Sequence, residues 1–182
     1  MKQVLLLGDS IRLSYQSLVK EKLNGMAEVV GPEDNCRFAK YTLWYVNQWV
    51  DEHSKPDIIH WNNGLWDVFH YNEEMGISTP LEEYVSYIKK ILKVLKNTGS
   101  KIIWATTTPV NAKNINYDNQ EIDRYNDEIM KYMMEEQIEV NDLSKIVKSN
   151  IELYIGEDNL HLSEKGREVC TEAVVRAIKK HL

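Results

Sequence analysis

The chain has 182 residues, of which 43% are hydrophobic and 27% are charged, and its formal net charge is −6. This length and composition are typical of one globular domain spanning residues 1–182, and the longest apolar runs are too short to cross a bilayer. Because the lysines and arginines are dispersed and the net charge is negative, the composition argues against a nucleic-acid-binding protein.

Short apolar runs alternate with longer segments of helical periodicity, which is typical of a parallel sheet covered by helices on both faces. The predicted strands are 2–7, 27–30, 57–62, 101–106 and 138–141. The predicted helices are 12–23, 40–52, 81–97, 119–136 and 164–181. This order predicts a three-layer α/β/α sandwich whose five-stranded parallel sheet has the flavodoxin-like order 2-1-3-4-5.

The first predicted strand ends abruptly in Gly8, Asp9 and Ser10. In such folds ligands bind beyond the carboxyl ends of the strands, near the switch point between strands 1 and 3. The segment "NNGLWD" (62–67) follows strand 3 and is therefore expected to face the same crevice. Asp9 or Ser10 can cap the next helix, and Ser10 can also act as a nucleophile, so the triplet alone leaves both interpretations open.

The predicted helix 81–97 has the clearest start signal. Thr79 is expected to cap it, Pro80 to occupy its first turn, Glu82 to complete a capping box, and Gly99 follows its end. Its apolar residues recur at helical spacing, so this stripe is predicted to face the core rather than a cofactor.

A nucleophilic serine needs a base, usually a histidine that a carboxylate orients. Three of the five histidines lie three residues after an aspartate: Asp57/His60, Asp67/His70 and Asp158/His161. The first pair falls in a strand, where an odd separation directs the side chains to opposite faces. The second pair remains possible. The third pair lies in a polar loop after the last strand, before a helix that Ser163 is expected to cap, and is favoured.

The sequence contains no G-x-x-x-x-G-K-[ST] loop, no G-x-G-x-x-G and no G-x-S-x-G. Nucleotide phosphate binding and the α/β-hydrolase arrangement are therefore disfavoured.

Three short segments, "GDSI" (8–11), "GLWD" (64–67) and "DNLH" (158–161), resemble in order and spacing the blocks of the SGNH (GDSL-type) hydrolases. The resemblance implies a serine esterase, a carboxylic ester hydrolase in which Ser10 is the nucleophile, His161 the general base and Asp158 its orienting partner. It implies no metal and no cofactor.

The oxyanion hole of this family uses the serine N–H, a glycine N–H from the second block and an asparagine side chain from the third. Here Trp66 stands at the asparagine position, so Asn62 or Asn63 is the predicted donor, with Asn62 favoured. The second block falls in "GPEDNCRFA" (31–39), which has no glycine near Cys36 and Arg37, and the backbone N–H of Arg37 is the predicted donor.

The resemblance therefore implies a metal-free serine esterase that removes a short acyl group, acetyl above all, from a carbohydrate or similar polar compound. Neither nucleic acid nor membrane is expected as a partner, and a cytoplasmic location is expected because no signal peptide is recognised. Trp61, Trp66, Phe69 and Tyr71 are a candidate platform for a sugar ring or acyl chain, although at least half of them are expected in the core or in loops. The alternative is a catalytically silent binding domain for a polar small molecule or glycan.

Overall fold

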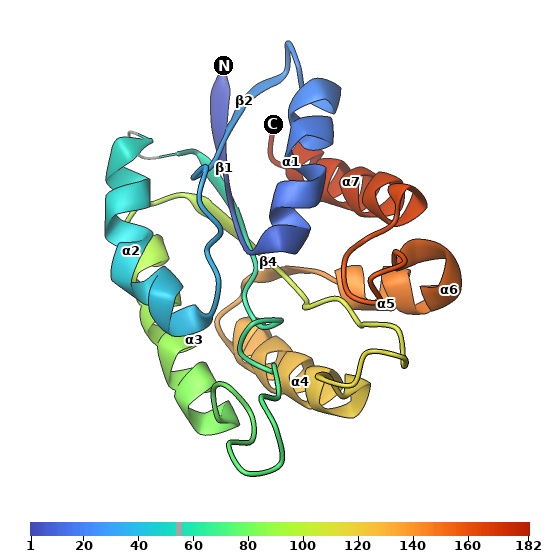
Figure 1. Ribbon diagram of the computed structural model, residues 1–182. Coiled ribbons are helices and arrows are strands. Elements are labelled where there is room, and N and C mark those ends of the chain that lie inside the picture. The colour runs from blue at the N-terminus through green and yellow to red at the C-terminus, as the bar shows by residue number, and fades with distance from the viewer. Residues whose placement is uncertain (54–55) are drawn as a thin grey trace.

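The computed structural model describes residues 1–53 and 56–182 and contains one parallel sheet (Figure 1). Its strands are β1 (Lys2–Leu7), β2 (Ala27–Val30), β3 (Ile58–Trp61), β4 (Lys101–Ala105) and β5 (Glu139–Asn141). Their order is β2-β1-β3-β4-β5, which confirms the predicted fold class and strand order. Each strand begins and ends within one residue of its predicted bounds, because both ends of each apolar run are sharp.

The helices are α1 (Ser10–Lys22), α2 (Ala39–Glu52), α3 (Leu81–Lys96), α4 (Asn119–Glu135), α5 (Leu143–Lys148), α6 (Ile151–Tyr154) and α7 (Glu164–Lys179). Helix α1 packs against α7 on one side of the sheet and α2 against α3 on the other (Figure 1). Helices α5 and α6 were not predicted. In the two described segments, no helix combines the length and apolarity needed to span a membrane.

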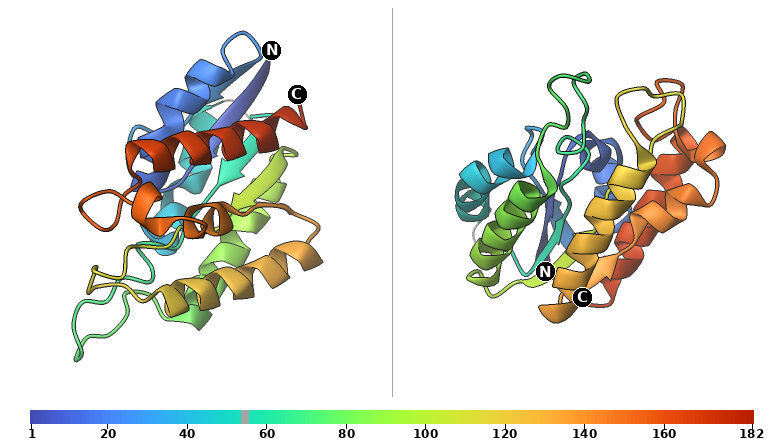
Figure 2. Two further views of the ribbon diagram at one scale, coloured as in Figure 1. Left: turned by 90° about the vertical axis from the view of Figure 1, so that its right-hand side faces the viewer. Right: turned by 90° about the horizontal axis from the view of Figure 1, so that it is seen from below.

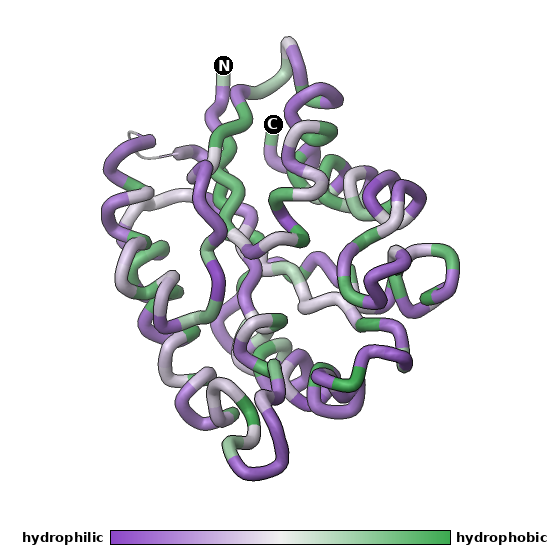
Figure 3. Tube along the Cα trace, in the orientation of Figure 1, coloured by the Kyte–Doolittle hydropathy of each residue, from purple (hydrophilic) through white to green (hydrophobic). Residues whose placement is uncertain are grey.

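The central strands carry the core. Residues Val4–Leu7 of β1 are completely buried, since helices cover both faces of a parallel sheet. Hydrophobic residues accordingly run along the central strands, whereas the outer sides of the helices are mostly hydrophilic (Figure 3).

The register of the sheet brings the functional segments together. Leu7 pairs with Trp61, and the N–H of Asn62 donates to the carbonyl of Leu7 at 3.0 Å, so β1 and β3 end at the same level. The loops that follow β3 and β4 and the loop before α7 project on one side of the molecule, and both chain ends lie on the opposite side (Figure 2, right). The crevice predicted at the carboxyl ends of the strands therefore lies among these loops.

The start of α3 corrects one prediction. Its N-cap is Pro80, and no side chain caps the helix. Thr79 is instead buried: its N–H donates to the carbonyl of Asp67 at 2.9 Å, and its own carbonyl accepts from the hydroxyl of Tyr125 at 2.7 Å. These tertiary contacts override the local capping box.

Candidate active site

Ser10 is the first residue of α1, directly beyond β1. The helix is capped by Asp9, whose Oδ1 accepts from the N–H of Ile11 at 2.9 Å. Gly8 is required for a close approach, because a Cβ at this position would lie 2.8 Å from the Cβ of Arg12. The capping function therefore belongs to Asp9, and the hydroxyl of Ser10 is available for another partner.

That partner is His161. Its Nε2 lies 2.9 Å from Ser10 Oγ, and its Nδ1 lies 2.6 Å from Asp158 Oδ2. Both distances fall in the range expected of a nucleophile, a base and an orienting carboxylate. With Nδ1 protonated and donating to Asp158, Nε2 is free to accept the proton of Ser10.

Asp158 is held by its own loop. Its Oδ1 accepts from the backbone N–H groups of Leu160 at 3.0 Å and His161 at 2.9 Å. Partial burial raises the pKa of this carboxyl, but the N–H of Leu160 and the ring of His161 outweigh burial, so the pKa lies below its ordinary value. The Asp158 side chain is 53% exposed, so solvent screens its electrostatic attraction for His161. Its main effect is therefore to orient the ring of His161 through the hydrogen bond to Nδ1.

The other histidines lie elsewhere. Asp57 accepts from the N–H of Gln3, and His60 is buried against Asn141, so this pair does not interact, as predicted. The backbone of His70 pairs with Asn116, and no hydrogen bond of the described residues joins its ring to Asp67 or Ser10. Ser10 therefore pairs with the favoured histidine.

The two asparagines that follow β3 are engaged differently. The amide of Asn63 donates to the carbonyl of Arg37 at 3.1 Å and to Thr42 Oγ1 at 2.8 Å, and its Oδ1 accepts from the Trp61 ring. Both of its amide hydrogens are thus committed, and Asn63 has none left for a substrate. Asn62 donates one hydrogen to the carbonyl of Ala105 at 2.8 Å, and among the described residues its other amide hydrogen has no acceptor.

Arg37 adopts a left-handed backbone conformation, with φ at 50°. This conformation favours glycine, the residue that the resembled family carries in this block. The N–H of Arg37 donates to Asn35 Oδ1 at 2.7 Å, so the predicted donor is already used within its own loop. Since the peptide between Arg37 and Phe38 is planar and trans, the N–H of Phe38 points away from Asn63.

Arg12 holds the loop between β2 and α2 in place, a role that the sequence analysis did not predict. Its guanidinium is buried and donates to the carbonyls of Gly8, Pro32 and Asp34 at 2.8 to 3.3 Å. The available signal was helical spacing, because Arg12 shares the buried face of α1 with Tyr15 and Val19.

Two further buried carboxyls lie near the crevice. Asp67 accepts from the N–H of Ala39 at the start of α2, at 3.0 and 3.1 Å. Burial raises the pKa of Asp67 to about 7 and that of Asp9 to about 6. Asp67 therefore connects the end of β3 to α2 rather than orienting His70.

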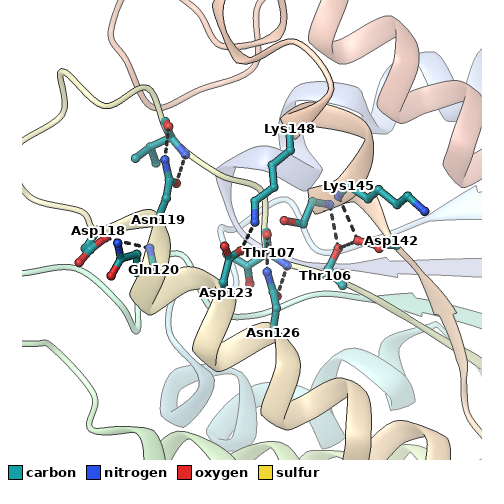
Figure 4. A network of polar contacts seen from close by, with 12 residues as sticks. Thr106, Thr107, Asp118, Asn119, Gln120, Asp123, Asn126, Asp142, Lys145 and Lys148 are labelled. Atoms are coloured by element: carbon teal, nitrogen blue, oxygen red, sulfur yellow. Dashed lines mark hydrogen bonds and ion pairs between the residues drawn. The ribbon is translucent and has the colours of Figure 1, made fainter.

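The chain after β4 is fixed by asparagines of α4 (Figure 4). Asn126 accepts from the N–H of Thr107 and donates to its carbonyl, both at 2.8 Å. Asn119 likewise accepts from the N–H of Val110 and donates to the carbonyl of Val110. Thr107 Oγ1 in turn donates to the carbonyl of Asn63 at 3.0 Å. The segment after β3 is thereby supported from α4.

A pocket of about 350 Å³ opens beside Ser10 and His161. We name it the aromatic pocket after the five aromatic side chains in its wall: Phe38, Trp66, Phe69, Tyr71 and Tyr117. Leu65 and Leu160 are its other apolar side chains. Trp61, in contrast, is fully buried in the core. Three of the four aromatic residues proposed as a platform therefore line this pocket.

Within residues 1–53 and 56–182, no three His, Cys, Asp or Glu side chains gather into a group that could hold a metal ion.

No protein-family model matches the sequence, and no curated protein matches it significantly. Solved structures do match. The acetyl xylan esterase AlAXEase has a TM-score of 0.82 at 19% identity, covering 97% of this chain and 99% of that one. The acetylxylan esterase Axe2 from Geobacillus stearothermophilus has a TM-score of 0.80 at 18% identity, covering 97% and 94%. A GDSL-like lipase from Bacteroides thetaiotaomicron has a TM-score of 0.76 at 18% identity, covering 100% and 89%.

The chain therefore shares its fold with the two acetyl xylan esterases and the GDSL-like lipase over at least 97% of its residues. The structure brings the three predicted site residues together: His161 contacts both Ser10 and Asp158.

Proposed function

We propose that the protein is a serine esterase that hydrolyses carboxylic esters with a short acyl group, acetyl above all, on a carbohydrate or similar polar compound. The observation that carries this proposal is the continuous hydrogen-bonded chain from Ser10 Oγ through His161 to Asp158. The acetyl group and the carbohydrate are supported by the fold shared with acetyl xylan esterases.

In this reaction Ser10 Oγ attacks the ester carbonyl while His161 Nε2 accepts its proton. His161 then protonates the leaving alcohol, and a water molecule, activated by the same histidine, releases the acid from Ser10. Asp158 holds the ring in the required tautomer and stabilises it when it is protonated.

The oxyanion requires donors, each of which is worth about a hundredfold or more in rate. We assign the N–H of Ser10, at the positive end of α1, and the remaining amide hydrogen of Asn62. The N–H of Phe38 replaces that of Arg37, since Phe38 lines the pocket beside Ser10.

A catalytically silent binding domain is the second candidate. It is favoured by one observation, the internal use of the Arg37 N–H and the Asn63 amide that were expected to bind the oxyanion.

One experiment separates the two candidates. Hydrolysis of p-nitrophenyl acetate is measured for the parent protein, Ser10→Ala and His161→Ala, with His70→Ala as the matched control. We expect kcat to fall by about a thousandfold or more in the first two variants and to be retained in the control. An organophosphonate probe should add its mass to Ser10 only in proteins that retain this serine. Equal background rates in all four proteins would contradict the esterase and leave the binding domain as the remaining candidate.

A further inference from the structure

The aromatic pocket is part of the reaction crevice. Ser10 and His161 belong to its wall, together with Leu160 from the loop that carries the base. One of the two groups of an ester that reacts at Ser10 therefore lies in or beside this pocket.

The pocket is much larger than an acetyl group needs. Its volume of about 350 Å³ corresponds to roughly ten water molecules at their share of liquid volume. An acetyl ester places a single methyl group on the acyl side of the carbonyl.

The wall is also poor in hydrogen-bonding partners. Apart from Ser10 and His161, its polar groups are the hydroxyls of Ser78, Tyr71 and Tyr117. A hydroxyl-rich group buried here would lose water contacts without regaining an equal number of hydrogen bonds. An apolar group gains from burial and from contact with the ring faces.

The pocket is built rather than incidental. The ring of Phe69 contacts Tyr71 edge-on at 5.1 Å between centroids and Tyr117 at 5.6 Å. The backbone N–H of His70 donates to the carbonyl of Asn116 at 2.9 Å, and the Asn116 amide donates back at 3.1 Å. The loops after β3 and β4, which supply most of the wall, are thereby joined to each other.

We infer that the ester substrate presents to the aromatic pocket an apolar group of about the size of an aromatic ring or a six-carbon chain. This inference rests on the proposed ester hydrolysis. The group belongs either to the acyl part of the ester, in which case it replaces acetyl in the proposed function, or to the alcohol part, in which case the acyl group remains acetyl.

The test measures kcat/KM by acid release for ethyl acetate, ethyl hexanoate and benzyl acetate. Because each buried methylene gives about a fourfold gain in affinity, we expect at least one larger ester to exceed ethyl acetate by about tenfold or more. Preference for ethyl hexanoate assigns the pocket to the acyl part, and preference for benzyl acetate assigns it to the alcohol part.

Trp66→Ala shortens the pocket wall at a side chain that is already 41% exposed, so the fold is expected to tolerate it. The loss in kcat/KM should be about fivefold greater for the preferred large ester than for ethyl acetate. Trp44→Ala is the matched control, because Trp44 lies on α2 outside the pocket and is 80% exposed; it should change neither rate.

Two results would overturn the inference. The first is a kcat/KM for ethyl acetate that equals or exceeds both larger esters, and the second is an equal loss for all esters in Trp66→Ala. If the parent protein hydrolyses none of the three esters and the phosphonate does not label Ser10, the proposed function itself fails, and the inference fails with it.

Discussion

The two sides of the crevice differ in how closely they follow the family that they resemble. On one side, Ser10, His161 and Asp158 form the expected chain of hydrogen bonds. On the other side, where oxyanion donors are expected, the glycine is replaced by Arg37 and the asparagine by Trp66. On the first side, local hydrogen bonds within one loop orient Asp158 and His161. The second side depends on long-range contacts to α2, to α3 and to the segment after β4.

The difference shows that a residue type expected to bind the oxyanion can be used within the protein instead. Asn63 uses both amide hydrogens to fix Arg37 and Thr42, while Tyr84 and Thr107 both donate to its carbonyl. The Asn63 side chain, predicted as a possible oxyanion donor, instead holds the loop around Arg37 against α2.

The largest expected effect lies at Asp158, on the side of the crevice that carries Ser10 and His161. Asp158→Asn should lower kcat by about a thousandfold, because the amide no longer selects the tautomer of His161 that accepts a proton at Nε2. Steady-state kinetics measure this change. Glu157→Gln, which alters an exposed carboxylate one residue away, should leave kcat unchanged. A loss below about tenfold in Asp158→Asn would show that the backbone alone orients the histidine.

The neighbouring asparagines should separate catalysis from stability. Asn62→Ala should lower kcat by about a hundredfold with little change in KM, because it removes a proposed oxyanion donor.

Asn63→Ala should lower the free energy of unfolding by about 2 kcal/mol, because Trp61, Arg37 and Thr42 lose a buried partner. Kinetics and denaturant unfolding of both variants test this division, and the reverse pattern would contradict it.

Asp67, on the side where oxyanion donors are expected, should make the stability of the protein depend on pH. Its pKa of about 7 in the folded protein lies above the ordinary value of 3.8, so its contribution to stability is complete at low pH and is lost as pH rises towards 7. Asp67→Asn cannot ionise. Its free energy of unfolding relative to the parent should therefore rise between about pH 4 and about pH 8. Denaturant unfolding at both pH values measures the difference, and a constant difference would contradict the raised pKa.

The smallest effect is expected at Arg37. Arg37→Gly removes the strain of a positive φ, whereas Arg37→Ala removes the same guanidinium and its contact with Tyr41 but keeps the strain. The glycine variant should be more stable than the alanine variant by about 1 kcal/mol, as measured by denaturant unfolding. Equal stabilities would mean that the loop changes conformation when the arginine is removed.

The sequence predicted the sheet well because its strands are apolar runs with polar ends. It predicted the pair Asp158 and His161 because the two residues lie three apart in one polar loop after the last strand. Helices α5 and α6 were missed because six and four residues are too few to show a helical period.

The oxyanion side could not be predicted in the same way. Which hydrogens of Asn62 and Asn63 remain unused depends on Ala105, Arg37 and Thr42, and these contacts join residues far apart in the chain. The raised pKa of Asp67 likewise follows from burial, which no local pattern indicates.

The capping of α1 by Asp9 has a consequence for engineering. Because Asp9 supplies the bond that starts the helix, the side chain at position 10 carries no structural duty there. The proposed nucleophile can therefore be exchanged: Ser10→Cys would place a thiol at the same helix terminus without removing a cap. Such a thiol offers a route from ester hydrolysis to acyl transfer on an unchanged scaffold.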